Sequence, residues 1–421
     1  MSVAAPGGDD DESVRVLRPK RAAPADAVRP TRAEINLGHL RHNLRVVERA
    51  IGKATRASNP GIAEVWGVLK ADAYGHGAPA VARTLERAGI SGLCVALLEE
   101  GLELRAAGIT LPILVMGGYY GPLHRGLEEV VEGGLTPVLY HAEQIEALAR
   151  IAKERGRSSI DYHLKFDTGM ARLGAALTAT NELLDLAHRT RGLTLTGLMS
   201  HLACADGADP APTTRQLRAF EEVVKAARAR GLTPRHCHVA NSAAAFAHPA
   251  SRLDAVRPGI ALYGVSPFVA PVAGNEAHDT ALELRPVMKV RSEIVAIRTL
   301  SKGDRVGYGH AWEADAERTL ATIPIGYADG LSRALTNRGH VVVRGRRAPI
   351  VGVVSMDLTT IDVTDIPGAS LGDEVVMLGS QDGPLGTAQV TSAEIADLCG
   401  TIPWEVVTSI SRRVPRFYRE P

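Results

Sequence analysis

The chain has 421 residues, of which 45% are hydrophobic and 23% charged, proportions typical of an ordinary soluble globular protein. That length exceeds what one hydrophobic core usually organises, so we expect two domains. With 48 Lys and Arg against 47 Asp and Glu, the chain lacks the net positive charge that attracts nucleic acid or an anionic membrane, and we expect neither as a partner. Small neutral or zwitterionic partners are compatible with this balance.

The four cysteines, Cys94, Cys204, Cys237 and Cys399, are scattered without CxxC spacing, and no secretory segment precedes them. We interpret them as buried apolar thiols rather than metal ligands or nucleophiles, and we expect no metal. No stretch approaches the roughly 18 to 20 uninterrupted apolar residues that a membrane span requires. These features predict a soluble protein of the reducing cytoplasm.

Residues 1–30 are rich in Asp, Ala, Pro and Arg and lack periodicity, which predicts a disordered tail. From about residue 33 to 260, short apolar runs alternate with segments of helical period, for example "EVWGVLK" with "GAPAVARTLERAGI" and "PILVMG" with "LHRGLEEVVEGG". Nearly continuous apolar strands in such alternation indicate a parallel sheet covered by helices. About eight such units predict an α/β fold, a TIM (β/α)8 barrel over residues 31–274.

After about residue 275 the pattern changes to strands separated by Gly, Pro and Asp turns, as in "TLATIPIGYADG" and "HVVVRGRRAPIVGVVSMD". One helical segment, "SAEIADLCG", interrupts these strands near the end of the chain. This pattern predicts a separate, mostly antiparallel β domain over residues 275–421.

Polar residues recur where the predicted barrel strands end. Catalytic groups of such barrels lie at the C-terminal ends of the strands, in the βα loops. Because these ends share one mouth of the barrel, we expect the side chains to meet there. The residues at these positions are Lys70, Lys165, Arg172, His201, Asn241, Ser242, Arg257 and Gly259.

Each of these residues also has an interpretation without chemistry. Lys70 alone would extend from a strand end to water, and Arg257 would pair with a carboxylate. His201 would be a hydrogen-bonded core histidine, and Ser242 would cap a helix. An amine against an apolar wall, however, favours the neutral form that forms an imine with an aldehyde. The context of Lys70 therefore favours a Schiff-base lysine.

The stretch "RPGIALYG" adds a phosphate hypothesis. A glycine after a strand lets backbone N–H groups approach an anion, and the helix that begins at "NSAAAF" favours negative charge at its N-terminus. A single glycine turn is weak support, since most such turns are only turns. Together with an imine-forming lysine it indicates an aldehyde cofactor with a phosphate group, pyridoxal 5′-phosphate (PLP).

The motifs together resemble those of the alanine racemases, a PLP-dependent family with a barrel and a β domain. They occur in family order from about residue 31 to the C-terminus. The stretches that carry the resemblance are "VLKADAYGHG", "HLKFDTGMARLG", "SHLACAD", "HVANSAA", "RPGIALYG", "VGYGHAW", "TIPIGYADG", "APIVGVVSMD" and "SISRRVPR".

The resemblance implies a two-base interconversion of L-alanine and D-alanine, which would supply D-alanine for peptidoglycan. Lys70 would bind PLP and serve as one base. Tyr308 would be the other base, on the opposite face of the cofactor, and would come from the partner subunit of a head-to-tail homodimer. Arg172 would contact the phenolic oxygen of the cofactor and the carboxylate of the substrate. Lys165, which is carbamylated in some family members, would orient Arg172.

Further residues would complete the site. Met356, again from the partner subunit, would offer its backbone N–H to the substrate carboxylate, and the adjacent Asp357 is counted with the catalytic candidates. Arg257 would face the pyridine nitrogen, with His201 hydrogen-bonded behind it. The residues expected around the phosphate are Tyr74, Ser242, Gly259, Ile260 and Tyr327. Without the resemblance, Tyr308 and Tyr327 would be interpreted as exposed turn tyrosines, Met356 as a core residue and Asp357 as a turn cap.

The chain departs from the family pattern at three positions. Trp404 stands where a tyrosine usually touches the phosphate, Ala171 replaces a frequent glycine, and Ser355 stands where cysteine is common. An indole N–H donates but cannot accept, so we expect the hydrogen bonds around the phosphate to differ locally from the family pattern. None of these changes removes a proposed catalytic group.

Two alternatives stay open from the sequence. One is a racemase of broader or different specificity, for example for serine, because sequence alone sets pocket size poorly. The other is a non-catalytic PLP-binding protein, although such carriers lack the β domain. A PLP decarboxylase is disfavoured, because it would place an acidic residue where Arg257 stands.

Overall fold

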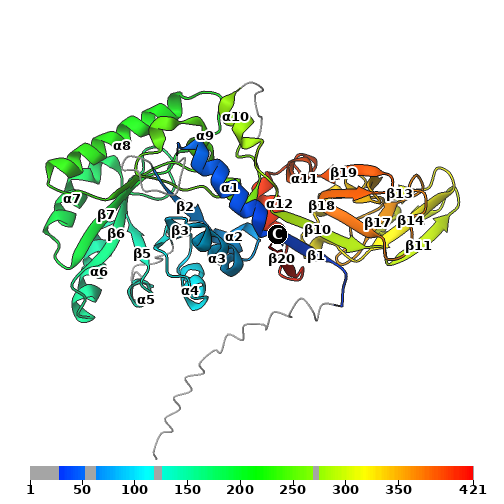
Figure 1. Cartoon of the computed structure of the whole chain (residues 1–421), viewed down its shortest axis with the longest axis horizontal. Coiled ribbons are helices and arrows are strands. Elements are labelled where there is room, and N and C mark those ends of the chain that lie inside the picture. The colour runs from blue at the N-terminus through cyan, green and yellow to red at the C-terminus, as the bar shows by residue number, and fades with distance from the viewer. Residues whose placement is uncertain (1–27, 53–62, 118–125, 269–274, 421) are drawn as a thin grey trace, which may run out of the picture.

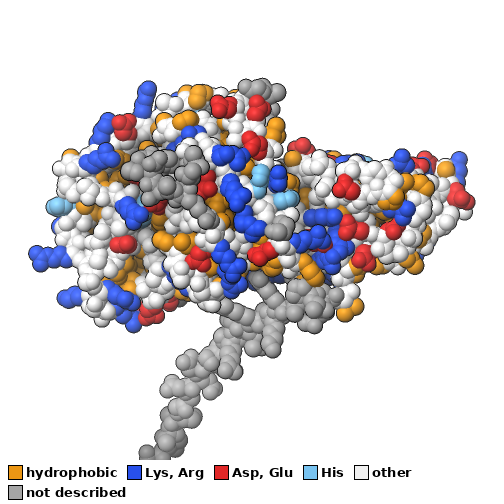
Figure 2. Space-filling model, in the orientation of Figure 1, with side chains coloured by type: hydrophobic (Ala, Val, Ile, Leu, Met, Phe, Trp, Pro, Cys, Tyr) orange, Lys and Arg blue, Asp and Glu red, His pale blue; other side chains and the backbone are white. Residues whose placement is uncertain are grey.

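The structure, a computed structural model, describes residues 28–52, 63–117, 126–268 and 275–420. Two parts lie side by side, a sheet ringed by helices and a domain of strands (Figure 1). Within the described ranges no helix is long and apolar enough to cross a membrane. Lys and Arg side chains are interspersed with Asp and Glu over the face shown in Figure 2, in keeping with the balanced charge of the sequence.

The first part contains an eight-stranded sheet in the order β8-β7-β6-β5-β4-β3-β2-β9, and every pair in it is parallel. The two ends of this order, β8 and β9, are in contact, so the sheet is a nearly closed barrel and the predicted fold class is confirmed. The strands are β2 (Glu64–Val68), β3 (Gly92–Val95), β4 (Ile113–Val115), β5 (Thr136–Leu139), β6 (Ile160–Lys165), β7 (Leu193–Met199), β8 (His236–His238) and β9 (Ala255–Val256).

Helices cover the outside of this sheet because each presents one apolar face. In α8, for example, Phe220, Val223 and Ala227 are buried, three and four residues apart. The helices are α1 (Leu37–Ala50), α2 (Lys70–Tyr74), α3 (Ala78–Ala88), α4 (Leu98–Ala106), α5 (Leu127–Glu132), α6 (Ala142–Glu154), α7 (Thr180–Arg189), α8 (Ala211–Ala229), α9 (Ser242–Ala247) and α10 (Glu276–Ala281).

The second part is built around a seven-stranded sheet in the order β16-β15-β18-β10-β1-β20, with β19 paired to β18. Smaller sheets, β11-β14-β17 and β12-β13, extend it away from the barrel (Figure 1). All pairs in this part are antiparallel except β1 with β20. The strands are β1 (Arg32–Asn36), β10 (Met288–Glu293), β11 (Ala296–Leu300), β12 (Arg305–Val306), β13 (Trp312–Glu313), β14 (Arg318–Ile323), β15 (His340–Val343), β16 (Arg346–Pro349), β17 (Thr359–Asp362), β18 (Glu374–Gly383), β19 (Gly386–Val390) and β20 (Arg416–Arg419).

Strand β1 lies in this second sheet, whereas the sequence placed residues 32–36 with the barrel. Ile35 pairs with Met288 of β10 on one side and with Tyr418 of β20 on the other, and it is fully buried. Glu34, only 5% exposed, accepts from Arg291 Nε at 2.7 Å and lies 2.7 Å from Arg419 Nη2. The two ends of the chain therefore meet in one sheet. The predicted domain limits, 31–274 and 275–421, otherwise stay a prediction.

Most of the predicted disordered tail, residues 1–27, lies outside the described residues. Within the described part of the predicted tail, Arg29 is ordered by an ion pair. It donates to both carboxylate oxygens of the buried Asp329, at 2.8 and 2.9 Å. The C-terminal helices that pack beside the second sheet are α11 (Ser392–Cys399) and α12 (Pro403–Ser409).

Candidate active site

A cavity of about 230 Å³ lies at the C-terminal ends of the barrel strands. It gathers residues that the sequence predicted at the ends of different strands, and it is polar where those residues enter it. Its lining consists of Val68, Lys70, Tyr74, Met116, His201, Asp206, Asn241, Ser242, Ala243, Arg257, Gly259, Ile260, Pro267 and Trp404. Seven of the predicted site residues thus share one cavity: Lys70, Tyr74, His201, Ser242, Arg257, Gly259 and Ile260.

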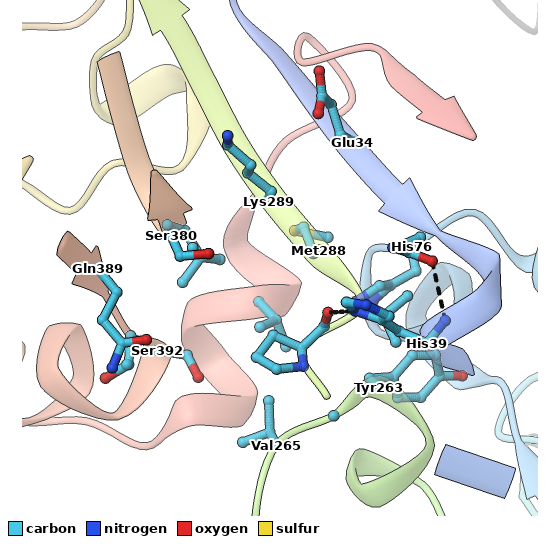
Figure 3. Close-up of a pocket in the computed structure, with 18 of the residues that line it drawn as sticks. Glu34, His39, His76, Tyr263, Val265, Met288, Lys289, Ser380, Gln389 and Ser392 are labelled. Atoms are coloured by element: carbon cyan, nitrogen blue, oxygen red, sulfur yellow. Dashed lines mark hydrogen bonds between the residues drawn. The ribbon is translucent and has the colours of Figure 1, made fainter. Parts of the chain in front are cut away.

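A larger cavity, of about 440 Å³, lies at the junction of the two parts and is bordered by β1, β10 and β18 (Figure 3). Its charged residues are already paired. Glu34 binds arginines, and Lys289 donates to Glu374 at 2.8 Å. His76 also lines this cavity, but its Nε2 atom is buried and has no hydrogen-bond partner. The smaller cavity, with the cations Lys70 and Arg257, is therefore the better candidate for chemistry on a charged molecule.

Lys70 begins a turn of unusual handedness. The next three residues, Ala71, Asp72 and Ala73, have φ near 54° and ψ near 50°, and Tyr74 has φ 54°. In this left-handed region each L-residue costs roughly 1–2 kcal/mol, because its Cβ crowds the following carbonyl oxygen. Strain of this kind persists only where surrounding contacts hold it, and it is common at functional sites. No local pattern predicts this conformation, since these residues are not glycines.

The contacts that hold the turn come from both parts of the molecule. His76 Nδ1 lies 3.0 and 2.8 Å from the carbonyl oxygens of Ala73 and Tyr74, so this nitrogen carries the proton. Arg416 of the β domain donates to the carbonyl of Gly75 at 2.9 Å. A Cβ on Gly75 would lie 2.6 Å from the carbonyl oxygen of Val407, which explains the glycine.

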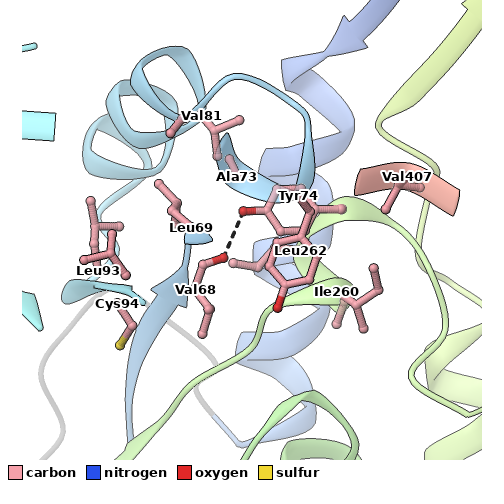
Figure 4. Close-up of a cluster of buried hydrophobic side chains, with 14 of the residues drawn as sticks. Val68, Leu69, Ala73, Tyr74, Val81, Leu93, Cys94, Ile260, Leu262 and Val407 are labelled. Carbon is pink, nitrogen blue, oxygen red and sulfur yellow. Dashed lines mark hydrogen bonds between the residues drawn. The ribbon is translucent and has the colours of Figure 1, made fainter. Parts of the chain in front are cut away.

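Buried apolar side chains pack beneath the same turn (Figure 4). Tyr74 packs against Tyr263, with ring centroids 4.8 Å apart, and Tyr263 donates its hydroxyl to the carbonyl of Val68 at 2.9 Å. Leu69 is fully buried among them. The strand that carries Lys70 is thereby anchored on its apolar side, while the amine at its end faces the polar cavity.

Burial lowers the pKa of Lys70 below its ordinary value, and the nearby Arg172 lowers it further, whereas Glu100 acts in the opposite direction. Lys165 is 6% exposed, and burial together with Arg257 and Arg172 lowers its pKa to about 8. A lowered pKa increases the fraction of neutral amine at neutral pH. Both lysines are therefore suited to nucleophilic chemistry.

Arg257 is held by two histidines rather than by His201 alone. Its Nη1 donates to His238 Nδ1 at 2.5 Å, while the distance from Nη2 to His201 Nδ1 is 3.4 Å. Because guanidinium only donates, His238 accepts through Nδ1 and carries its proton on Nε2, which lies 2.9 Å from His163 Nδ1. Burial lowers the pKa of His238 well below its usual value, and the positive charge of Arg257 lowers it further, so this imidazole is neutral.

His238 is a contact that the sequence reasoning missed. The available signal was its position in "HVANSAA", three residues before Asn241 and at the end of a strand. His201 does lie beside Arg257, as expected, and burial lowers its pKa to about 3. The environment of Arg257 thus holds neutral imidazoles, and burial lowers the pKa of Arg257 itself to about 10, which leaves it cationic at neutral pH.

At the other end of the cavity, hydroxyl and backbone N–H groups converge. The backbone N–H of Gly259 donates to Ser242 Oγ at 2.9 Å. The hydroxyl oxygen of Tyr74 also lies close to Gly259, because a Cβ built on this glycine would be only 2.3 Å from it. Asn241, rather than Ser242, caps helix α9 by accepting from the N–H of Ala244 at 3.0 Å. The hydroxyl of Ser242 is therefore not consumed by a helix cap. Because it accepts from Gly259, this hydroxyl keeps its own proton to donate, and together with the Tyr74 hydroxyl it suits a phosphate group.

Arg172 lies in the loop after β6, outside the lining of the cavity but close enough to lower the pKa of Lys70. The carboxylate of Asp167 shapes this loop by accepting from the backbone N–H groups of Gly169 and Met170, both at 2.8 Å, and of Arg172 at 3.2 Å. Ala171 has φ 55°, the left-handed conformation that favours glycine. This accounts for the glycine that is frequent at this position in the resembling family.

The predicted residues of the β domain do not enter the cavity of the same chain. Tyr308 is 74% exposed and Met356 is 52% exposed. Asp357 accepts from Arg413 Nη2 at 2.6 Å. Tyr327 is 43% exposed, and its backbone N–H donates to the carbonyl of Ser355 at 3.0 Å, which joins the two loops. The segment of Tyr308 lies between β12 and β13, in the part of the β domain that points away from the barrel (Figure 1).

Family models match both parts of the chain. The model described as "Alanine racemase, N-terminal domain" matches residues 35–267, and the model described as "Alanine racemase, C-terminal domain" matches residues 287–418. Together they cover most of the chain, including the cavity residues and the exposed tyrosine of the β domain.

Individual proteins match over nearly their whole length. An alanine racemase of Sorangium cellulosum (strain So ce56) is 61% identical over 394 residues, which is 94% of this chain and 100% of that protein. The solved alanine racemase of Streptomyces coelicolor A3(2) has a TM-score of 0.83 and 36% identity, covering 94% of this chain and 100% of that one. An alanine racemase of Clostridium difficile 630, solved in complex with cycloserine, has a TM-score of 0.80 and 35% identity, covering 92% and 95%.

Proposed function

This chain belongs to the alanine racemase family, and from that premise we propose that it interconverts L-alanine and D-alanine with PLP as its cofactor. It is an amino-acid racemase, and the racemisation of alanine supplies D-alanine for peptidoglycan. The single observation that carries the cofactor proposal is the cavity that Lys70 shares with Arg257, Ser242 and Gly259. These residues fit PLP, because an amine with a lowered pKa shares the cavity with hydroxyl donors that suit a phosphate and with a guanidinium.

When bound, PLP supplies an electron-accepting ring that makes the Cα proton of the amino acid removable. Lys70 would hold the cofactor through its amine and would take up or release a proton there. The hydroxyls of Ser242 and Tyr74 would bind the phosphate, with Gly259 and Ile260 beside them. Arg257 would hold the ring through a hydrogen bond to its pyridine nitrogen. A guanidinium has no acceptor, so it cannot accept a hydrogen bond from a protonated pyridine nitrogen and favours the unprotonated ring. An unprotonated ring would be a weaker electron acceptor, which would restrain side reactions such as transamination.

Arg172 binds the carboxylate of the substrate, and Lys165 orients Arg172. The pKa of about 8 at Lys165 leaves a neutral fraction near neutral pH, which is the form that reacts with carbon dioxide to give a carbamate. Tyr308 of the partner subunit is the second base, and Met356 of the partner subunit donates its backbone N–H to the substrate. The exposure of both side chains supports this proposal, because it leaves them accessible to a second copy of the chain.

The cofactor and the activity are tested together by incubating the protein with PLP and L-alanine and measuring both enantiomers by chiral chromatography. Release of the α-deuterium of labelled L-alanine distinguishes proton abstraction from other chemistry. A panel that includes serine tests the substrate preference. The proposal fails if the protein binds PLP with the visible absorbance of an imine yet neither enantiomer of alanine is converted.

The homodimer is tested by subunit complementation. Lys70→Ala and Tyr308→Phe chains are each expected to be poorly active, but a mixed dimer contains one site with both groups intact. If subunits exchange at equal concentration, about half of the dimers are mixed and activity recovers to about a quarter of the wild-type value. No recovery after demonstrated exchange would show that both bases come from one chain. The cytoplasmic location stays a prediction.

A further inference from the structure

The carboxylate of Glu100 joins two loops at the mouth of the barrel. Glu100 lies in the first turn of α4, and its Oε2 accepts from the backbone N–H groups of Ala96 and Leu97 at 2.8 and 3.0 Å. Its other oxygen, Oε1, accepts from the backbone N–H of Ala71 at 2.6 Å. Ala71 directly follows Lys70 and is the first residue of the left-handed turn.

We propose that Glu100 is a positioning residue for Lys70, which fixes the start of the left-handed turn through Ala71 and places a negative charge beside the lysine. This inference rests on the proposed PLP-dependent function.

The bond to Ala71 matters because the turn is strained. A residue in the left-handed conformation is free to return to an ordinary one unless its backbone groups are held. Ala71 is exposed, so packing does not hold it, and its N–H is instead held by a charged acceptor. If the Ala71 N–H were released, the direction in which the Lys70 side chain leaves the backbone would vary. Geometry errors of this kind reduce turnover more than binding.

The charge matters because the other groups near Lys70 are mostly cationic or neutral. Arg172 lowers the pKa of Lys70, while Glu100 raises it. Glu100 therefore opposes the loss of the proton from Lys70, and the two effects set how much neutral amine is present. Glu100 and Arg172 act directly on Lys70, and the titratable groups that line its cavity are Tyr74, His201, Asp206 and Arg257. Lys165, like Lys70, lowers the pKa of His201.

The test compares Glu100→Gln and Glu100→Ala with the wild-type protein and with Glu99→Gln, an exposed carboxylate of the same helix. The first readout is the rate at which PLP reacts with the cofactor-free protein as a function of pH, since only neutral Lys70 forms the imine. Because Glu100 raises the pKa of Lys70, removing its charge is expected to move the midpoint of this rate profile to lower pH. The expected shift is about one pH unit, the smallest shift typical of a nearby opposite charge. Glu99→Gln is expected to leave the midpoint unchanged.

The second readout separates charge from geometry. Glu100→Gln keeps one oxygen that can accept from Ala71, whereas Glu100→Ala removes it. We expect kcat to fall about tenfold more in Glu100→Ala than in Glu100→Gln, with similar KM values, as for a misplaced catalytic group. The inference would be overturned if the pH midpoint stayed at the wild-type value in both variants and if Glu100→Ala and Glu100→Gln had the same kcat. If the wild-type protein itself did not bind PLP or convert alanine, the proposed function would fail instead, so the two failures are distinguishable.

Discussion

The substitution Gly259→Ala isolates the phosphate end of the cavity from the chemistry at Lys70. The φ of Gly259 is −112°, outside the left-handed region that favours glycine. Its added Cβ, however, would lie 2.3 Å from the hydroxyl oxygen of Tyr74 and 3.0 Å from Cζ of the same ring. Tyr74 is 7% exposed and packs 4.8 Å from Tyr263, so its ring has little room to move away.

Two costs follow from this geometry. Forcing an extra methyl group into a packed site costs about 1–3 kcal/mol of folding stability. Displacing the Tyr74 hydroxyl removes a hydrogen bond to a charged phosphate, which is worth about 1.5–3 kcal/mol. The dissociation constant of PLP is therefore expected to rise about 10- to 100-fold. The Lys70 amine is untouched, so imine formation at saturating PLP is expected to persist.

The assay is a titration of the cofactor-free protein with PLP, followed by visible absorbance, with thermal unfolding measured in parallel. Gly207→Ala is the matched control, because its Cβ would meet only the carbonyl oxygen of Cys204, at an ordinary 3.4 Å. The control is expected to bind PLP like the wild-type protein. PLP affinity that stays at the wild-type value in Gly259→Ala would refute the assignment of Tyr74 and Gly259 to the phosphate.

Three further predictions address the bases, the substrate loop and the pH dependence of stability. Lys70→Ala is expected to lose the visible absorbance of bound PLP along with activity, whereas Tyr308→Phe should keep the absorbance and lose racemisation of alanine in both directions. Unchanged L-alanine turnover in Tyr308→Phe would rule it out as a base. Ala171→Gly is expected to raise the free energy of unfolding in urea by about 1 kcal/mol, because φ 55° is strained for alanine, and a loss of stability would contradict this. Burial lowers the pKa of His76 to about 4 and of His163 to about 3, below the value of about 6.5 in the unfolded chain. The unfolded state therefore binds more protons between pH 6.5 and these values, and each imidazole is expected to cost up to about 1.4 kcal/mol of stability per pH unit as the pH falls through this window. Denaturant titrations at pH 7 and pH 5 measure the slope, which should be shallower in His163→Gln.

Much of the architecture could be predicted because it depends on local patterns. Apolar runs that alternate with helical segments produce parallel strands covered by helices, and the change of pattern near residue 275 marks the second set of strands. Residues at the C-terminal ends of such strands share one edge of the barrel. The sequence therefore predicts that Lys70, Ser242 and Arg257 lie near one another.

Other features depend on contacts between distant segments, and only the tertiary structure decided them. Strand β1 pairs with β10 and β20, whose residues lie more than 250 positions further along the chain, so no local pattern could show this pairing. The handedness of the turn after Lys70 has no local signal, since it is held by Glu100 and by Arg416 of the β domain. His238 became the partner of Arg257 only through the packing of β8 beside β9. Residue type and spacing determined which groups reach the mouth of the barrel, whereas long-range packing decided how each of them is oriented and charged.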